Sequence, residues 1–235
     1  MRATFITTRV VVALAVVAAI LAQLARSVDV ANRGGEHHTG TVLVNFFSYF
    51  TIDSNTLTVV VLLVGAVRLA RRETGDSHAL TVARAAVTTF MVITGVVYNL
   101  LLRHIDLPQG ATVGWSNEIL HVVAPAYVVL DWLLAPGRSR LHTKDALLVL
   151  AFPLAWTAYT LLRGPFASDP FNGTDFWYPY PFLNPVTASG GYAEVAAYVA
   201  GITVVFVAVA LGLGRTTRRD SPARADRSPL AGQQG

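Results

Sequence analysis

The chain has 235 residues, of which 53% are hydrophobic and 14% charged, and its formal net charge is +4. An ordinary soluble domain carries about 25% charged residues, so this composition favours a membrane-embedded protein over a soluble globular one. The sequence contains no cysteine, which excludes a disulfide framework and a thiolate metal site.

Six apolar segments approach the length of about 20 residues that a helix needs to cross a hydrocarbon core roughly 30 Å thick. They cover residues 10–25, 42–67, 85–102, 115–134, 146–162 and 192–214. We therefore expect an all-α integral membrane protein with one six-helix transmembrane domain at residues 1–214 and a disordered basic tail at residues 215–235. The first segment, which follows Arg2 and Arg9, also has the features of a cleavable signal peptide, and both interpretations stay open.

The distribution of basic residues predicts the orientation, because basic residues in short loops stay on the cytoplasmic side. With the N-terminus inside, only Arg26, Arg33, Arg103 and Arg163 fall on the outer side. Both termini are then cytoplasmic. Arginine is used almost exclusively in place of lysine, which suggests a bacterial gene and a plasma membrane. We expect the basic tail to lie near anionic lipid and not to bind nucleic acid, and the oligomeric state is left open.

Polar residues recur at helical spacing within the second and fourth segments. Ser48, Thr51, Asn55 and Thr58 share one face if residues 42–67 form a continuous helix. Asn117 and His121 align in the same way in "NEILHVVAP", with Glu118 beside them. At a rise of about 1.5 Å per residue, His121 and Thr51 come to similar depth below the outer face.

These residues predict a polar pocket in the outer half of the bundle, to which Asn99 in the third segment and Glu194 in the sixth would also contribute. Ionisable groups at membrane depth are costly unless paired or hydrated, so His121 is a candidate functional residue. Amides and hydroxyls also hold helices together, and Asn55 and Asn99 can have that role instead.

Other ionisable residues suggest no further site. Asp131 falls near the cytoplasmic end of its segment, where water is close. His37 and His38 lie together in "GEHHTG" without a spaced set of other ligands, so we expect no metal site and no cofactor.

The segment between the fifth and sixth helices is rich in proline and aromatic residues, including "FWYPYPFLNP". Tryptophan and tyrosine prefer the membrane interface, so this segment can be an interfacial anchor. Its position above the outer mouth of the pocket fits a lid equally well.

Three segments carry a resemblance to a known family: "NFFSYFTIDSN", "NEILHVVAP" and "FWYPYPFLNP". They resemble the six-helix membrane proteins related to the androgen-induced and androgen-dependent (FAR-17a-like) hydrolases, together with their actinobacterial Pr6Pr relatives. The animal members are threonine hydrolases that cleave fatty acid esters of hydroxy fatty acids with one threonine and one histidine.

The resemblance implies that Thr51 is the nucleophile and His121 the base. The other polar residues of the expected pocket are candidates to support these two or to bind the substrate: Ser48, Asn55, Asn99, Asn117 and Glu118. Sliding the second-segment motif by three residues would put Ser48 in the place of Thr51, and the sequence does not decide between them. The sequence also leaves open whether the chain is a hydrolase of lipid esters or a membrane protein that binds or transports a small or lipidic ligand without chemistry. Its expected partners are the lipid bilayer and, for the hydrolase, a lipidic ester substrate.

Overall fold

The protein was analysed as a computed structural model that describes residues 1–33, 38–73, 75–105 and 112–219. Within these ranges the fold is helical, with one isolated β-bridge between Asp169 and Thr174 and no strand. The elements in chain order are α1 (Arg2–Asn32), α2 (Thr39–Phe46), α3 (Phe50–Ala70), α4 (His78–Val97), η1 (Tyr98–Leu102), α5 (Gly114–Glu118), η2 (Ile119–Val123), α6 (Ala124–Leu134), α7 (Thr143–Arg163), η3 (Gly164–Phe166), η4 (Pro181–Leu183) and α8 (Gly191–Arg219).

Six helical stretches are long and apolar enough to cross a membrane, which confirms the expected number of spans. They are Arg2–Asn32, Phe50–Ala70, His78–Leu102, Gly114–Leu134, Thr143–Phe166 and Gly191–Thr217. Many of their large apolar side chains point outward, among them Leu134, Leu147, Leu162 and Val204. Such continuous apolar surface is expected where helices face lipid. The fold therefore indicates a multi-pass membrane protein.

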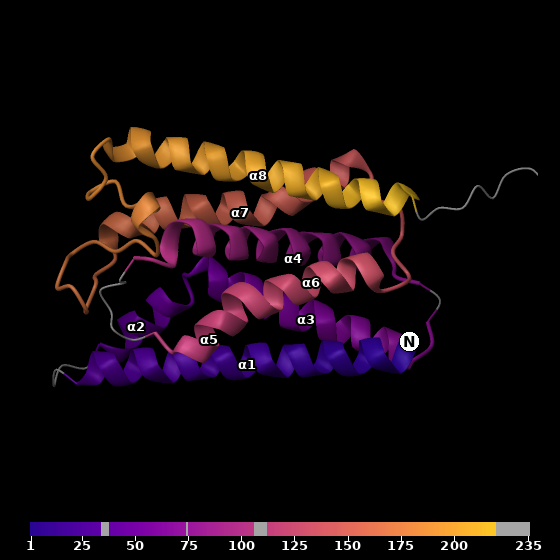
Figure 1. The fold of residues 1–235 in the computed structure, drawn as a ribbon. Coiled ribbons are helices and arrows are strands. Elements are labelled where there is room, and N and C mark those ends of the chain that lie inside the picture. The colour runs from indigo at the N-terminus through magenta and orange to yellow at the C-terminus, as the bar shows by residue number, and fades with distance from the viewer. Residues whose placement is uncertain (34–37, 74, 106–111, 220–235) are drawn as a thin grey trace, which may run out of the picture.

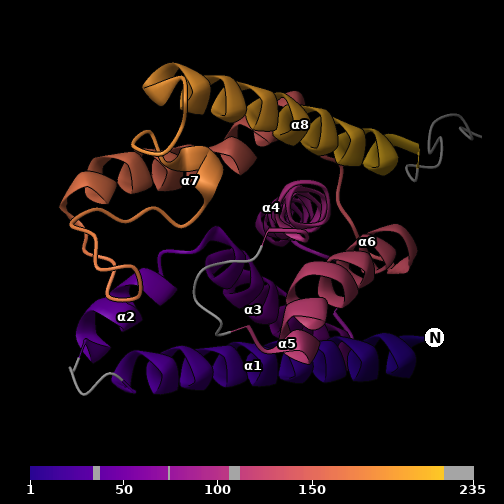
Figure 2. The same cartoon turned by 60° about the vertical axis from the view of Figure 1, so that its left-hand side comes forward.

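Consecutive spans run in opposite directions along the bundle, so that Met1 and the end of α8 lie at the same end of it (Figure 1). We call this the terminal end. The opposite end carries α2 and residues 167–190, and we call it the loop end. Helix α4 lies in the middle of the bundle, where Figure 2 views it along its axis, and it contacts α3, α6, α7 and α8. Helix α1 packs chiefly along α3.

The second span is shorter than predicted, because the apolar run at residues 42–67 is broken between α2 and α3. Tyr49 has an extended backbone (ψ 128°) and precedes the first residue of α3. The break is held by tertiary contacts: Trp156 Nε1 donates to the Ser48 carbonyl at 3.1 Å, and the Tyr49 ring packs edge-on against Trp177. Ser48 therefore lies outside the helix that carries Thr51, and the predicted four-residue stripe is wrong at this position.

A buried ion-pair network crosses the bundle between α1, α4 and α6. Asp131 accepts from Arg9 Nε at 2.8 Å and from Arg84 at 3.1 Å, and Arg84 also pairs with Asp76. The side chain of Asp131 is only 6% exposed, so the expectation that water solvates it is wrong. The two guanidinium groups compensate its charge instead. Loss of the first segment as a signal peptide would remove Arg9 from this network.

The segment before α8 folds back onto the helices. Trp177, Tyr178 and Leu183 of this segment are buried, and the interfacial anchor and the lid both stay predictions. Arg163 donates to Asn45 Oδ1 at 2.6 Å and its guanidinium lies 5.4 Å from the centre of the Trp177 ring. Asn45 of α2 also donates to the Ser168 carbonyl at 3.1 Å, so the segment is tied to both α2 and the end of α7.

The expected start of the tail and the expected histidine pair both lie at the limits of the residues that the structure describes. Helix α8 continues to Arg219, beyond the boundary expected at residue 214. Residues 220–235 of the expected tail, and His37 of the histidine pair, lie outside the described residues.

Candidate functional site

Thr51 and His121 meet near the loop end of the bundle. Thr51 is the second residue of α3 and is 8% exposed. Its Oγ1 lies 3.3 Å from Nε2 of His121, within hydrogen-bond reach. The similar depth expected from helical rise therefore corresponds to a direct contact between the two side chains.

The other ring nitrogen fixes the tautomer of His121. Nδ1 lies 2.9 Å from the main-chain carbonyl oxygen of Asn117, which can only accept a hydrogen bond. Nδ1 therefore carries the proton in the neutral ring, and Nε2 presents its lone pair to the Thr51 hydroxyl. This is the arrangement in which the imidazole can take a proton from Thr51.

Two π-helical turns, η1 and η2, face one another at this point, and they carry Tyr98 and His121. The rings of these residues stack with centroids 4.0 Å apart and an interplanar angle of 27°. The Asn117 side-chain amide donates to the Tyr98 hydroxyl, which ties the start of the fourth span to η1. Single π-helical turns inside α-helices occur frequently at functional sites. Here they place the Tyr98 ring against one face of the His121 ring.

Tyr180 is a site residue that the sequence analysis did not identify. Its hydroxyl accepts from the Thr51 backbone N–H at 3.2 Å and also lies 3.2 Å from Thr51 Oγ1. Burial raises the pKa of the Tyr180 phenol to about 12, although the hydrogen bonds with Thr51 lower it. The phenol is therefore protonated at neutral pH and can donate to Thr51 Oγ1 while that hydroxyl donates to His121.

The hydrogen bonds connect Tyr180, Thr51, His121 and Asn117 in one direction, and we call this chain the relay. The Tyr180 O–H points to Thr51 Oγ1, the Thr51 O–H to His121 Nε2, and the His121 Nδ1–H to the Asn117 carbonyl. The backbone N–H of Thr51 belongs to the first turn of α3, where the helix dipole favours negative charge. Thr51 Oγ1, in the middle of the relay, can therefore give its proton to His121 Nε2 at the start of a helix, where negative charge is favoured.

The relay lies between two cavities that share Thr51, Tyr98, His121 and Tyr180. The first runs between α4, α7 and α8 and is open to the outside, with about 710 Å³ of space when its open mouth is included. Apolar side chains form most of its wall, including Ile93, Leu150, Trp156, Ile202 and Phe206. The second runs toward α1 and α5 past Gln23, Ser116 and Asn117. A molecule with an apolar chain and a polar reacting group can therefore place that group at Thr51.

Several predicted site residues have other partners. Ser48 Oγ donates to the Val44 carbonyl at 2.7 Å and lies 2.9 Å from the Tyr159 hydroxyl, on the far side of the helix break from the relay. Asn55 is fully buried and donates to the carbonyls of Thr51 and Leu120, so it joins α3 to η2. These contacts favour Thr51 over Ser48 as the hydroxyl beside His121.

The remaining predicted residues lie at the edge of the site or outside it. Asn99 donates to the Gly95 carbonyl at 2.8 Å, and Glu118 is half-exposed and pairs with Arg103. Glu194 accepts from Ser189 and from the Gly190 backbone at the start of α8. None of the three lines either of the two cavities at the relay. Asn117 takes part through its carbonyl and through its contact with Tyr98.

We compared the chain with family models, curated proteins and solved structures. None of the three comparisons gave a match.

Proposed function

We propose that the chain is a membrane hydrolase of lipid esters, with Thr51 as the nucleophile and His121 as the general base. The observation that carries the proposal is the 3.3 Å contact between Thr51 Oγ1 and the unprotonated Nε2 of His121. A threonine hydroxyl is a weak nucleophile until a neighbouring base removes its proton. The relay supplies that base with the tautomer already fixed by Asn117.

In the proposed reaction, Thr51 Oγ1 attacks the ester carbonyl carbon as its proton passes to His121 Nε2. The carbonyl oxygen gains negative charge, and the Tyr180 phenol is the neighbouring donor that can stabilise it. The tetrahedral intermediate collapses, the carbon–oxygen bond to the alcohol breaks, and His121 protonates the leaving alcohol. Water, activated by the same imidazole, then releases the acid and restores Thr51.

The substrate class follows from the shape and polarity of the first cavity. Its wall is built from apolar side chains of α4, α7 and α8, and it ends at the polar groups of the relay. An ester of a long-chain acid places its chain in that cavity and its carbonyl at Thr51. This arrangement is also what supports the proposed kinship with the six-helix membrane threonine hydrolases, whose motifs the segments around Thr51 and His121 resemble.

The proposed setting is a bacterial plasma membrane with both termini in the cytoplasm. Met1 and the end of α8 lie at the terminal end (Figure 1), where the last turn of α3 carries Arg68 and the α6–α7 connection carries Arg138 and Arg140. Basic residues are retained on the cytoplasmic side, so the terminal end would face inward and the relay would lie in the outer half of the membrane. Lipid esters would then reach the site from the outer leaflet.

A second candidate is a protein that binds a lipidic ligand without cleaving it. The apolar wall of the first cavity favours this function as well, because binding alone needs a cavity and no nucleophile. Such a protein has no need of a threonine hydroxyl directed at a histidine of fixed tautomer, which is why we favour the hydrolase.

Ester turnover by purified variants tests the proposal. We expect Thr51→Ala and His121→Ala to lower the hydrolysis of a long-chain p-nitrophenyl ester at least about 100-fold, while Thr51→Ser keeps part of the activity. Thr56→Ala is the matched control, because Thr56 lies on the exposed side of the same helix and bonds to the Ile52 carbonyl. Unchanged turnover in folded Thr51→Ala and His121→Ala would contradict the hydrolase, and reversible binding of the ester without turnover would favour the second candidate.

A further inference from the structure

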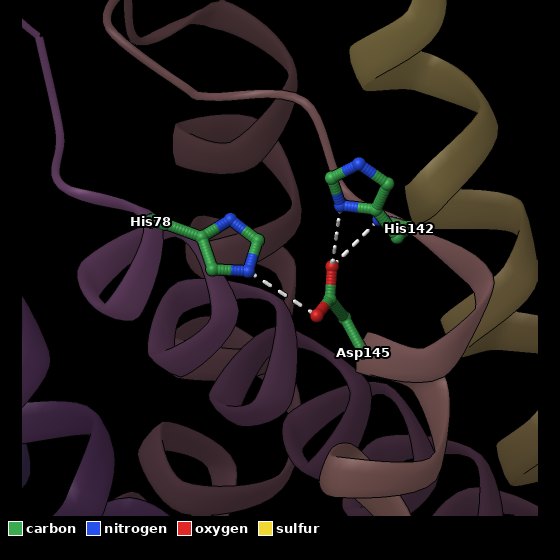
Figure 3. A group of neighbouring side chains, drawn as sticks. All are labelled: His78, His142 and Asp145. Atoms are coloured by element: carbon green, nitrogen blue, oxygen red, sulfur yellow. Dashed lines mark hydrogen bonds and ion pairs between the residues drawn. The ribbon is translucent and has the colours of Figure 1, made fainter.

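Three side chains that can bind a metal converge at the terminal end, far from the relay. His78 is the first residue of α4, His142 immediately precedes α7, and Asp145 lies in the first turn of α7. Figure 3 shows the Asp145 carboxylate between the two imidazole rings, with one ring near each oxygen. His142 and Asp145 are three positions apart, but His78 is 67 positions from Asp145, so no local spacing signals the whole cluster.

The distances suit a single small ion. His78 Nε2 lies 3.2 Å from one carboxylate oxygen of Asp145 and His142 Nδ1 lies 3.7 Å from the other. The potential ligand atoms of the three residues all lie within 4.8 Å of one another. Zinc binds nitrogen and oxygen at about 2.0–2.2 Å, so ligands at the corners of a tetrahedron are about 3.4 Å apart. Small rotations of two exposed imidazoles would bring the cluster to that geometry.

Burial divides the cluster into a fixed part and an adjustable part. The Asp145 side chain is 4% exposed and accepts from the His142 backbone N–H at 2.6 Å, which caps α7 and fixes the carboxylate. The imidazoles of His78 and His142 are 49% and 61% exposed, so they have room to turn toward an ion. A cavity lined by His142, Thr143 and Asp145 adjoins the cluster and gives water access to it.

We propose that His78, His142 and Asp145 form a binding site for a divalent transition metal, with Zn²⁺ as the ion that the ligand set fits best. Two imidazoles and a carboxylate suit zinc and its neighbours in the first transition row, whereas Mg²⁺ and Ca²⁺ prefer oxygen ligands throughout. Three protein ligands leave a fourth position for water from the adjoining cavity. The ion would join the start of α4 to the start of α7 and so stabilise the terminal end of the bundle.

The site is independent of the proposed hydrolase. It lies at the opposite end of the bundle from Thr51 and His121 and shares no residue with the relay. Metal binding can therefore succeed or fail whatever the ester assay shows.

Metal titration of the full chain tests the proposal. The protein is purified in detergent, freed of its affinity tag, treated with a chelator and dialysed against Zn²⁺ before the bound metal is measured. We expect one tightly bound zinc ion per chain, and at least tenfold weaker binding in His78→Ala and in His142→Ala. His104→Ala is the matched control, since His104 is an exposed histidine outside the cluster and its loss should leave zinc binding unchanged.

The thermal unfolding midpoint provides a second measurement on the same samples. Zinc should raise the midpoint of the wild type and of His104→Ala, because a ligand that binds the folded state stabilises it. It should leave the midpoints of His78→Ala and His142→Ala unchanged. Both cluster histidines are exposed, so these variants should fold without metal. The proposal is overturned if the wild type binds no zinc, or if both variants bind it as tightly as the wild type.

Discussion

Oγ1 of Thr51 lies 3.3 Å from Nε2 of His121, although 70 positions separate the two residues in the chain. The main-chain carbonyl of Asn117 holds the histidine in the tautomer that accepts from Thr51. This relationship connects the fold to the proposed chemistry, because a packed bundle alone does not require a hydroxyl directed at a histidine lone pair.

The Tyr180 hydroxyl should contribute to turnover without being needed for folding. In Tyr180→Phe the ring can still stack on Phe182, at the present centroid separation of 5.3 Å, while the donor to Thr51 Oγ1 is lost. Removal of one donor to a developing oxyanion commonly costs about 100- to 1,000-fold in kcat, and we expect a loss of that order. Ester kinetics on the folded variant provide the measurement.

Tyr159→Phe is the matched control for this change. The Tyr159 hydroxyl lies beside Ser48 and outside the relay, so its removal should leave turnover within about twofold if Thr51 is the nucleophile. A large loss of turnover in Tyr159→Phe, with full turnover in Tyr180→Phe, would indicate that Ser48 and not Thr51 is the nucleophile.

Gly95 controls how closely α4 approaches η2. A Cβ at this position would lie 3.2 Å from the His121 carbonyl oxygen and 3.3 Å from Pro125 Cβ, so Gly95→Ala should push the two elements apart by a few tenths of an ångström. We expect turnover to fall by about tenfold or more, because small displacements of catalytic groups are costly. Gly212→Ala, where a Cβ meets nothing within 4 Å, should leave turnover unchanged. Equal activity in the two variants would show that this close approach does not position His121.

The buried carboxylate of Asp131 should be a major determinant of stability. Asp131→Leu leaves Arg9 without its buried partner and removes one of the two acids that pair with Arg84, a type of loss that typically costs about 3–5 kcal/mol. Thermal unfolding in detergent measures the effect.

Asp29→Leu serves as the comparison for Asp131→Leu. Asp29 also pairs with two arginines, Arg26 and Arg33, but its side chain is 52% exposed. Exposed pairs contribute about 0–1 kcal/mol, so this variant should unfold close to the wild-type temperature. A similar small shift for Asp131→Leu would show that the buried network adds little.

The alkaline limit of stability should depend on Tyr180. Its folded-state pKa of about 12 lies above the ordinary value of 10.0, so the folded protein retains this proton more strongly than the unfolded chain. The resulting stability is fully present below pH 10 and is lost as the pH rises toward 12. The unfolding midpoint of the wild type should fall across this window, and that of Tyr180→Phe should fall less. Parallel curves for the two proteins would contradict the raised pKa.

Apolar length and composition were enough to predict the six spans, because lipid imposes both on every crossing helix. The break before Phe50 was not predictable, since several polar residues of 42–67 recur at helical spacing and the break depends on contacts with Trp156, Trp177 and Tyr180. Ser48 was placed on the wrong element for that reason.

The candidate site was predictable in part. Helical rise gave the depth of Thr51 and His121, but depth does not fix which faces of two helices meet, and their contact required the structure. Tyr180 was missed because aromatics in a connecting segment suggest an interfacial anchor, although "FWYPYPFLNP" had been identified as a distinctive segment. The pairing of Asp131 with Arg9 joins α6 to α1 across the whole fold, and nothing local to either residue signals it.

The most direct test of the relay is to locate the adduct that a fluorophosphonate forms with the purified protein, by mass spectrometry of its peptides. The account predicts a single adduct on Thr51 that disappears in His121→Ala and persists in Ser48→Ala. An adduct on Ser48, or no adduct on a folded wild-type protein that binds the ester, would contradict Thr51 as an activated nucleophile.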